Sequence, residues 1–349
     1  MIKTVCFLTT YRCNARCGFC ECRPESDEML SLADMIRYMD EAIALGTVGQ
    51  IVFSGGEPTL LGDDLFTAIA YARQHGLLTR VVTNGWWGKT PERADEFLNR
   101  LIAAGLHEIN ISLDDLHQDW IPFESVKNAF LACVRRQFRC LLAHKVLMSA
   151  RITRKYLEEQ FGIALIEFER DRVYTPDEEC RLISTGVVVP VGPQPHDYVP
   201  EELTYGQFRG SCGSVLRDII IGANHQFLPC CGIVTKNLPE LTFGDLREKR
   251  MIDAIDEANN DLMANWLALE GPAAIAEFAK KKDPSLPFER RYTGICHVCN
   301  EVLTRPDVRR VLVQHIDEIK ERVQLHRAFL EVARKDTEIM DTYSHPRSG

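Results

Sequence analysis

The chain has 349 residues, of which 45% are hydrophobic and 26% are charged, and its formal net charge is −9. This length can bury a full-sized core, so it excludes a single small module, and the acidic balance argues against a broad nucleic-acid surface, which needs clustered Lys and Arg. No segment approaches the roughly 20 uninterrupted apolar residues of a membrane span, and the N-terminal apolar run is too short for a signal peptide, so we expect a soluble, cytoplasmic protein with no nucleic-acid or membrane partner.

Short β-branched runs alternate with amphipathic stretches from residue 4 to about residue 170. Repeated βα units of this kind build a parallel sheet with helices outside it and functional loops at the carboxyl ends of the strands. Six units predict an α/β fold with an open, partial (β/α)6 barrel similar to a TIM barrel, although a doubly wound sheet would give much the same pattern. We expect strands at 5–9, 51–54, 79–83, 108–113, 141–148 and 163–168, and helices at 32–45, 65–74, 94–104 and 126–138.

The first predicted strand leads directly into the motif Cys13-x3-Cys17-x2-Cys20. Cysteines in a chain without a secretion signal stay reduced, so their clustering predicts metal binding or redox chemistry rather than disulfides. Three thiolates in one loop can each hold one iron of a [4Fe–4S] cluster and leave the fourth iron open to a ligand. The alternative is a zinc site completed by Cys22 or by a distant His.

The second predicted strand ends in the turn Ser54-Gly55-Gly56-Glu57-Pro58. Two glycines let the backbone approach a ligand closely, and a carboxylate beside them can accept a charge-assisted hydrogen bond from an ammonium group. Taken alone, the same letters describe an ordinary strand-to-helix turn. The third and fourth strands also end in polar residues that could face a ligand, or serve only as turn residues: Asn84, Ser112 and Asp114.

The alternation of strand-like and helix-like segments ends near residue 186, and a stretch rich in Pro and Gly covers 189–195. Beyond it we expect a hairpin with strands at 218–221 and 226–228, helical sequence over 246–279, and a C-terminal amphipathic helix from 306 to 335. These breaks predict three parts: the barrel at 1–185, a smaller α+β region at 186–305, and a helix and tail at 306–349.

The second region carries four cysteines that the hairpin and a Cys-x2-Cys turn could bring together: Cys212, Cys230, Cys296 and Cys299. Such a site could hold zinc or a fully ligated [4Fe–4S] cluster, or form a closed structural knot. Cys230 and Cys231 are adjacent, and both cannot easily point at one centre from a strand. The cysteines in apolar or helical contexts are expected to be core residues: Cys6, Cys133, Cys140 and Cys180.

The cysteine loop, followed one βα unit later by Gly-Gly-Glu-Pro, resembles the signature of the radical S-adenosylmethionine (SAM) superfamily. The resemblance implies that Cys13, Cys17 and Cys20 bind a [4Fe–4S] cluster whose open iron takes the amino and carboxylate groups of SAM. It places Phe19 near the adenine and Glu57 against the SAM amine. The cofactor-binding residues that it implies are Phe19, Ser54, Gly55, Gly56, Glu57, Asn84, Ser112 and Asp114.

The second cysteine set, in a chain with this loop, resembles the Twitch subdomain, the shortened form of the SPASM domain, which holds one auxiliary [4Fe–4S] cluster. Cys230 matches the ligand position of that subdomain, and Cys231 is then the spare. No cysteine follows Cys299, so the resemblance implies one auxiliary cluster with four protein ligands. A cluster without an open iron is better suited to moving an electron than to binding substrate.

The implied activity begins with an electron from an external donor of the flavodoxin or ferredoxin type. SAM cleavage then yields a 5′-deoxyadenosyl radical, which takes a hydrogen atom from a substrate. The arrangement resembles aminocyclitol dehydrogenases, anaerobic sulfatase-maturing enzymes and peptide maturases. Because the first strand begins near residue 4, we expect no fused leader-binding module, which favours a small-molecule substrate or a peptide delivered by a partner.

Three residues are candidates for substrate contact or acid–base catalysis: Asp115, His117 and Arg151. Family members often have Gly where this chain has Asp115. This difference makes Asp115, together with the nearby His117, a candidate for contact with the substrate rather than with SAM. Glu167 and Glu169 are further candidates to line the cavity, with surface ion pairs as the alternative for them and for Arg151. From other functional classes, an iron–sulfur redox sensor or a zinc-stabilised binding module would account for part of the cysteine pattern.

Overall fold

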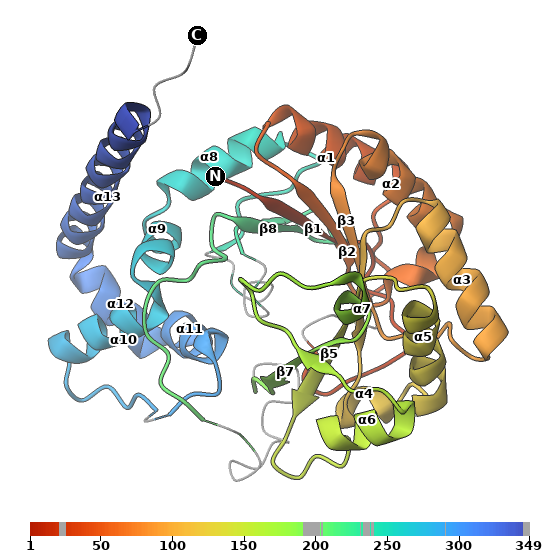
Figure 1. Cartoon of the computed structure of the whole chain (residues 1–349). Coiled ribbons are helices and arrows are strands. Elements are labelled where there is room, and N and C mark those ends of the chain that lie inside the picture. Colours follow the sequence, from red (N-terminus) through yellow and green to blue (C-terminus); the bar gives the residue numbers. More distant parts are fainter. Residues whose placement is uncertain are drawn as a thin grey trace.

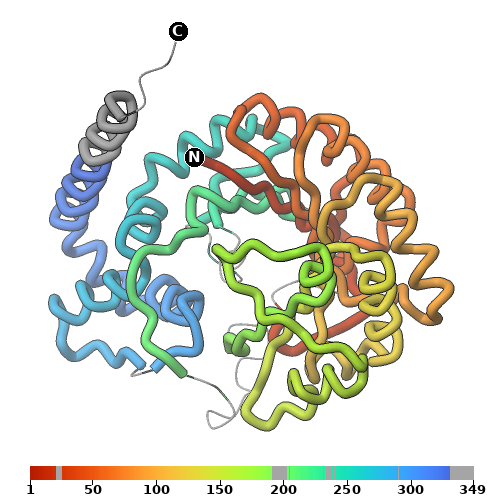
Figure 2. Tube along the Cα trace, viewed as in Figure 1, coloured from red at the N-terminus to blue at the C-terminus, as the bar shows by residue number. Residues whose placement is uncertain are grey.

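The computed structural model describes residues 1–20, 26–190, 203, 205–230, 232, 238, 241–289 and 291–344, with side chains described as far as residue 330 (Figures 1 and 2). Cys22, Cys231 and the end of the stretch rich in Pro and Gly, 191–195, lie outside these residues. Among the described helices, none combines the length and the apolar character that crossing a membrane requires.

A nine-stranded sheet forms the centre of the molecule, in the order β6-β7-β5-β4-β3-β2-β1-β8-β9. Every neighbouring pair is parallel except the hairpin β8–β9. The strands are β1 (Thr4–Leu8), β2 (Gln50–Ser54), β3 (Leu78–Thr83), β4 (Glu108–Ser112), β5 (Cys140–Val146), β6 (Ile166–Glu167), β7 (Leu182–Val187), β8 (Asp218–Ile221) and β9 (Phe227–Leu228).

Helices cover the outer face of this curved sheet (Figure 1). Alternate strand residues, such as Phe7 and Phe53, are fully buried beneath them, because successive side chains of a strand point to opposite faces. The fold therefore confirms the predicted α/β barrel architecture. The helices of this part are α1 (Leu32–Ala44), η1 (Pro58–Leu61), α2 (Asp63–Gln74), α3 (Pro91–Ala103), α4 (Asp115–Gln118), α5 (Phe123–Arg135), α6 (Arg154–Phe161) and α7 (Pro176–Glu179).

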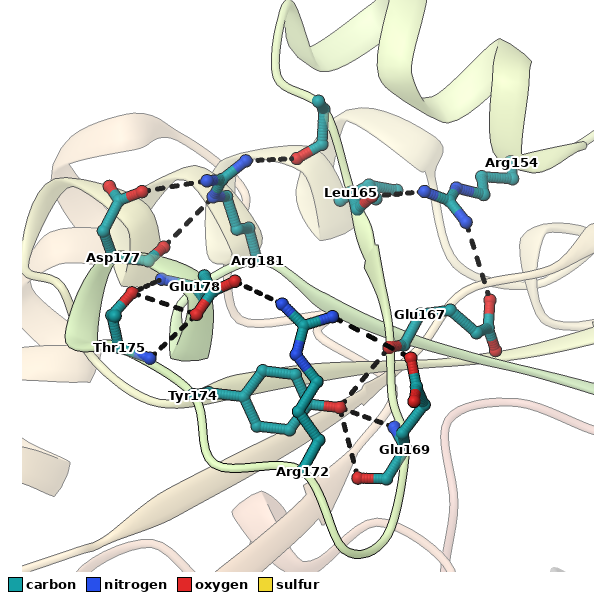
Figure 3. Close-up of polar contacts among 11 residues, drawn as sticks. Arg154, Leu165, Glu167, Glu169, Arg172, Tyr174, Thr175, Asp177, Glu178 and Arg181 are labelled. Atoms are coloured by element: carbon teal, nitrogen blue, oxygen red, sulfur yellow. Dashed lines mark hydrogen bonds and ion pairs between the residues drawn. The ribbon is translucent and has the colours of Figure 1, made fainter.

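The sixth strand differs from the sequence-based expectation of a strand at 163–168. The neighbour of β5 is β7, with Leu142 opposite Ile183, whereas the expected segment forms only the two-residue β6 at the sheet edge. Between them the chain turns back on itself, held by an Arg172–Glu178 ion pair and by a capping box at Thr175 (Figure 3). Local patterning identified an apolar run, but pairing with β5 selected the longer run that follows.

The C-terminal region begins by extending the same sheet. The predicted hairpin is confirmed, since β8 pairs with β9, and β8 also pairs in parallel with β1. The helix α8 (Met251–Asn260) then adds Met251 and Ile255 to the barrel core. Sequence far beyond residue 185 therefore completes that core.

A second hydrophobic core lies around the buried Trp266, in the part predicted to be helical. The helices that form this second core lie beside the nine-stranded sheet and its helices. The last helix of the chain contacts α9 and extends away from the rest of the molecule (Figure 1). They are α9 (Leu262–Leu269), α10 (Gly271–Lys282), α11 (Ile295–Thr304), α12 (Pro306–Gln314) and α13 (Ile316–Ser344).

Candidate functional site

The cysteine loop follows β1 and lies at the carboxyl end of the sheet. Cys17 is buried, and Cys13 and Cys20 are half-buried against the barrel core. Burial, and then the nearby Asp114 and Cys13, raise the pKa of Cys17 to about 12, so its thiol form is favoured in the protein alone. Metal coordination deprotonates a thiol outright, so this crowded set of sulfurs fits a cationic cluster.

The Gly55-Gly56 turn packs directly on the backbone that leads into the cysteine loop. The amide of Gly56 donates to the Thr10 carbonyl oxygen over 2.6 Å, and the amide of Glu57 donates to the Arg12 carbonyl oxygen over 2.8 Å. A Cβ added to Gly56 would lie only 2.0 Å from the Arg12 oxygen. The close approach predicted from the two glycines is therefore made here to the chain's own loop, which the turn holds in place.

Glu57 is fully buried beneath this turn, and its carboxylate joins the ends of β2 and β3. Its Oε1 accepts hydrogen bonds from the Thr59 hydroxyl (2.6 Å), the Thr59 amide (3.1 Å) and the Thr83 hydroxyl (2.8 Å). Its Oε2 accepts one from the Asn84 amide, at 2.8 Å. Burial raises the pKa of Glu57 and these donors oppose the rise. A contact with the SAM amine stays a prediction.

Asn84 reaches from the end of β3 to the cysteine loop. Its Nδ2 donates to Asn14 Oδ1 over 2.7 Å and lies 3.8 Å from Cys13 Sγ. The family resemblance implied a SAM contact for Asn84, and no sequence motif pointed to Thr59 or Thr83. Only the spatial meeting of two strand ends shows that these hydroxyls serve the Glu57 carboxylate.

Asp114, Phe19 and His117 meet beside the loop. Asp114 is fully buried at the start of α4, where it accepts from the His117 amide, and both of its oxygens lie 2.9 Å from His117 Nδ1. The His117 ring meets Phe19 edge to face, with centroids 5.3 Å apart. A carboxylate at Nδ1 fixes the orientation of the imidazole and the position of its proton. Ser112, half-buried, ends β4 two residues before Asp114.

Asp115 and Arg151 bind each other. Asp115 Oδ1 lies 3.2 Å from Arg151 Nε, and Asp115 Oδ2 accepts from the amides of Arg151 and Ile152. The Arg151 side chain is 82% exposed, which favours the surface ion pair among the two interpretations of that residue. At the sheet edge, Glu167 accepts hydrogen bonds from Thr185. Nearby, Glu169 pairs with Arg172 (Figure 3).

The structure brings the second set of cysteines to one small cavity. The thiols of Cys212, Cys230, Cys296 and Cys299 line it together with apolar side chains, among them Val215 and Leu267. Cys296 and Cys299 lie one turn apart on α11, and a Cβ added to Gly232 would lie 3.0 Å from Cys230 Sγ and 3.6 Å from Cys296 Sγ. Within the described residues, no group of three or more His, Cys, Asp or Glu side chains is placed to hold a single metal ion.

The thiols of this cavity are electrostatically linked. A hydrogen bond with Cys230 is the largest cause that lowers the pKa of Cys212 to about 6, and burial raises the pKa of Cys299. Four cysteines among mostly apolar neighbours are the donor set that a cluster bound by four thiolates would use. The cysteines expected in the barrel core, Cys133, Cys140 and Cys180, are buried, and Cys6 is half-buried.

Comparison with known proteins gives matches to the N-terminal part and to the fold. Residues 7–144 match the model of the Radical SAM superfamily. The GTP 3′,8-cyclase of Synechococcus elongatus is 29% identical over 172 residues, which cover 46% of this chain and 49% of the cyclase. The matched part thus spans about half of that relative.

Two solved structures share the fold. Native anSMEcpe with bound AdoMet and the Cp18Cys peptide has a TM-score of 0.50 at 12% identity, over 93% of this chain and 99% of that chain. SuiB of Streptococcus suis bound to the precursor peptide SuiA has a TM-score of 0.51 at 15% identity, over 73% of this chain and 64% of that chain.

Proposed function

We propose, because residues 7–144 match the Radical SAM superfamily model, that the chain is an enzyme that uses a [4Fe–4S] cluster and SAM, cleaves SAM and abstracts a hydrogen atom from a substrate. One observation carries the proposal: the loop of Cys13, Cys17 and Cys20 is held in place by the Gly55-Gly56-Glu57 turn. A redox sensor or a zinc-stabilised binding module does not need an iron that is open to SAM, so neither would need this turn to hold the cysteine loop in place. When bound, cluster and SAM supply the 5′-deoxyadenosyl radical, given an electron from a flavodoxin- or ferredoxin-type donor.

In this proposal the chain's own residues bind the cluster and SAM and orient them. Cys13, Cys17 and Cys20 hold the cluster, and Asn84 anchors their loop through Asn14. Phe19 and the imidazole of His117, fixed by Asp114, form the adenine side of the site. Ser112 is a contact for the carboxylate or ribose of SAM, and the buried Glu57, whose carboxylate accepts hydrogen bonds from Thr83 and Asn84, is the partner of the SAM amine.

We further infer that the net reaction oxidises or remodels a small aminocyclitol- or sugar-like molecule. Cys212, Cys230, Cys296 and Cys299 would hold the auxiliary [4Fe–4S] cluster, and their cavity is closed by apolar side chains. Such a cluster suits electron acceptance and not substrate binding. A ribosomal peptide or protein substrate is the alternative, and it remains an arm of the experiment because shared fold alone does not specify a substrate.

The test is deuterium transfer in anaerobically reconstituted protein supplied with SAM and dithionite. Panels of carbon-deuterated aminocyclitols, amino sugars and peptides are incubated in turn, and 5′-deoxyadenosine is analysed by mass spectrometry. Deuterium gained from an aminocyclitol or a sugar supports the proposal, whereas deuterium gained from a peptide supports the alternative. Cluster-replete protein that releases no 5′-deoxyadenosine at all would refute the enzyme and favour the sensor.

A further inference from the structure

A groove of about 670 Å³ lies on the C-terminal helical part of the chain. Helix α10 contributes Ala273 and Ala276 to its wall, and α11 contributes Val298. Two further segments line it, and the Gly206 amide of one donates to the Tyr292 carbonyl oxygen of the other over 2.8 Å. This volume lies within the roughly 300–1,000 Å³ of typical binding sites. Three aromatic side chains line the groove: Phe208, Phe288 and Tyr292.

The groove and the second cysteine site share two helices as walls. On α10, Pro272 lines the cysteine cavity and the next residue, Ala273, lines the groove. On α11, Cys299 lines the cavity and the preceding residue, Val298, lines the groove. Successive side chains of a helix point about 100° apart, so each helix presents one face to the thiols and another to the groove. A molecule in the groove therefore lies about one helix width, roughly 10 Å, from the cysteine cavity.

The chain is basic around this groove, although it is acidic as a whole. Residues 280–310, which include the end of α10 and all of α11, carry eight Lys and Arg but only four Asp and Glu, whereas the whole chain has a net charge of −9. Two of those four carboxylates, Glu301 and Asp307, bind the same guanidinium, that of Arg305. The remaining basic residues of the segment therefore outnumber its remaining carboxylates.

Two lysines of α10 carry this positive charge into the groove. Lys280 and Lys281 both line it, and both are exposed. The Lys280 ammonium donates to the Leu286 carbonyl oxygen over 2.6 Å, which holds it in position. In the part of the chain that the structure describes, neither lysine forms an ion pair. Both ammonium groups are thus left for a partner to approach.

The two carboxylates that line the groove have basic neighbours of their own. Glu277 lies 3.5 Å from Arg209, and both side chains are exposed. Glu289 lies 3.7 Å from Nε2 of His297. The groove therefore combines aromatic rings with an excess of cations, which fits an acidic protein surface that carries some apolar side chains.

The position of the groove favours an electron carrier over a substrate. All the described residues that line it lie between 206 and 298, in the C-terminal region. A substrate must reach SAM at the first site, whereas an electron carrier needs only to come near the second site. Electron-transfer complexes are also short-lived and have small interfaces, below about 1,200 Å², so a single basic groove is enough to seat one.

We propose that this groove is the docking surface for an acidic electron-carrier protein of the flavodoxin or ferredoxin type. The proposal rests on the proposed function, because it assumes that the second cysteine site holds the auxiliary cluster. The exchange moves one electron from that site to the oxidised carrier, so the site is oxidised and the carrier reduced, and no bond forms or breaks. Because most of the chain is acidic, the basic groove also selects the orientation in which an acidic carrier approaches.

The first measurement is the affinity of the reconstituted full chain for an acidic flavodoxin, by biolayer interferometry at about 0.01 M ionic strength, where the Debye length is about 30 Å. Lys280→Glu with Lys281→Glu should weaken binding about tenfold, chiefly through slower association, and Lys280→Arg with Lys281→Arg should keep it. The matched control is Lys3→Glu with Lys155→Glu, which changes the net charge equally at two exposed lysines elsewhere. At about 0.15 M ionic strength the effect should shrink, because the Debye length falls to about 8 Å.

A thermal melt of each variant establishes that it is folded. Equal flavodoxin affinity in the Lys280 and Lys281 double variant and in the control would overturn the proposal. A glutamate-rich peptide is the second probe. If the double variant loses this peptide but keeps its flavodoxin affinity, the groove is a peptide site, and the proposal is likewise overturned.

The second measurement is electron exchange in protein whose Cys13, Cys17 and Cys20 are replaced with Ala, so that only the second site holds a cluster. This protein is chemically reduced and mixed with oxidised flavodoxin in a stopped-flow spectrometer. At flavodoxin concentrations below the Kd, Lys280→Glu with Lys281→Glu should slow flavin reduction about tenfold. If flavodoxin binds but gains no electron, the groove is not an electron-transfer surface. Zinc in the second site, found by metal analysis before any carrier is added, would instead refute the auxiliary cluster of the proposed function.

Discussion

The two cysteine sites are built in opposite ways. The N-terminal site takes its three thiols from one loop, and that loop rests on backbone contacts with the Gly55-Gly56 turn. The C-terminal site takes its thiols from three separate segments between residues 212 and 299, and its cysteines pack on the second hydrophobic core. A cluster in the first site should therefore add function to a fold that stands without it, whereas a cluster in the second should hold its part of the fold together.

The largest expected effect is the loss of activity when the three N-terminal cysteines are replaced, which tests whether the first site serves function rather than folding. Replacing Cys13, Cys17 and Cys20 together with Ala should abolish 5′-deoxyadenosine formation and leave about half of the roughly eight irons of two four-iron clusters. The thermal midpoint should fall only slightly, because Cys17 is the one of the three that is buried in the barrel core, and a change from Cys to Ala removes a single atom there. Iron analysis, chromatography of the nucleoside and a circular-dichroism melt measure the three quantities. Retention of all the iron would contradict the assignment of these ligands.

The next effect tests the structural side. Cys296→Ser with Cys299→Ser should lower the free energy of unfolding by at least about 2 kcal/mol, the scale for losing a link that closes a long loop. Where the variant stays folded, substrate-free 5′-deoxyadenosine should persist and the oxidised product should be lost. Denaturant unfolding must precede the activity assay. Normal product from a folded variant without its second cluster would show that the site is only structural.

A smaller effect tests how the turn supports the first site. Gly56→Ala should cost about 1–3 kcal/mol and reduce iron in the N-terminal site, because its Cβ would overlap the Arg12 carbonyl oxygen. Gly49→Ala is the matched control, since a Cβ there meets no atom within 4 Å. Denaturant midpoints and iron content of the two variants give the comparison. Equal effects in both would mean that the loop does not need the turn.

The smallest effect concerns a contact that joins the two regions. His225 Nδ1 lies 2.8 Å from the hydroxyl of the buried Tyr38, and burial lowers the pKa of His225 below its usual value. The unfolded chain therefore takes up the proton first, so this contribution is present at neutral pH and is lost as the pH falls below the usual His value. His225 has φ 64°, a conformation that Asn tolerates, which makes His225→Asn the suitable variant.

His225→Asn should reduce the free energy of unfolding by about 0.5–1.5 kcal/mol at neutral pH. The difference from the unaltered chain should narrow between about pH 7.5 and about pH 5.5, as the histidine charges. Urea unfolding at both pH values measures this. If the difference in unfolding free energy between the unaltered chain and His225→Asn grows on acidification, the charged imidazole is the stabilising form.

The sequence by itself determined the βα rhythm, the cysteine loop and the Gly-Gly-Glu turn, because each depends on residues that are close along the chain. Apolar alternation located β1 to β5, and a spacing of three and two residues placed three thiols in one loop whatever the rest of the chain does. The hairpin β8–β9 was predicted for the same reason, from a turn between two short strands.

Only the tertiary structure decided which segments meet. It selected β7 over β6 as the neighbour of β5, paired β8 with β1, and joined Thr83 and Asn84 to Glu57. It also paired Asp115 with Arg151. Local patterning cannot supply these results, because several apolar runs and polar strand ends compete for the same neighbours and the packing of the whole barrel determines which contact forms.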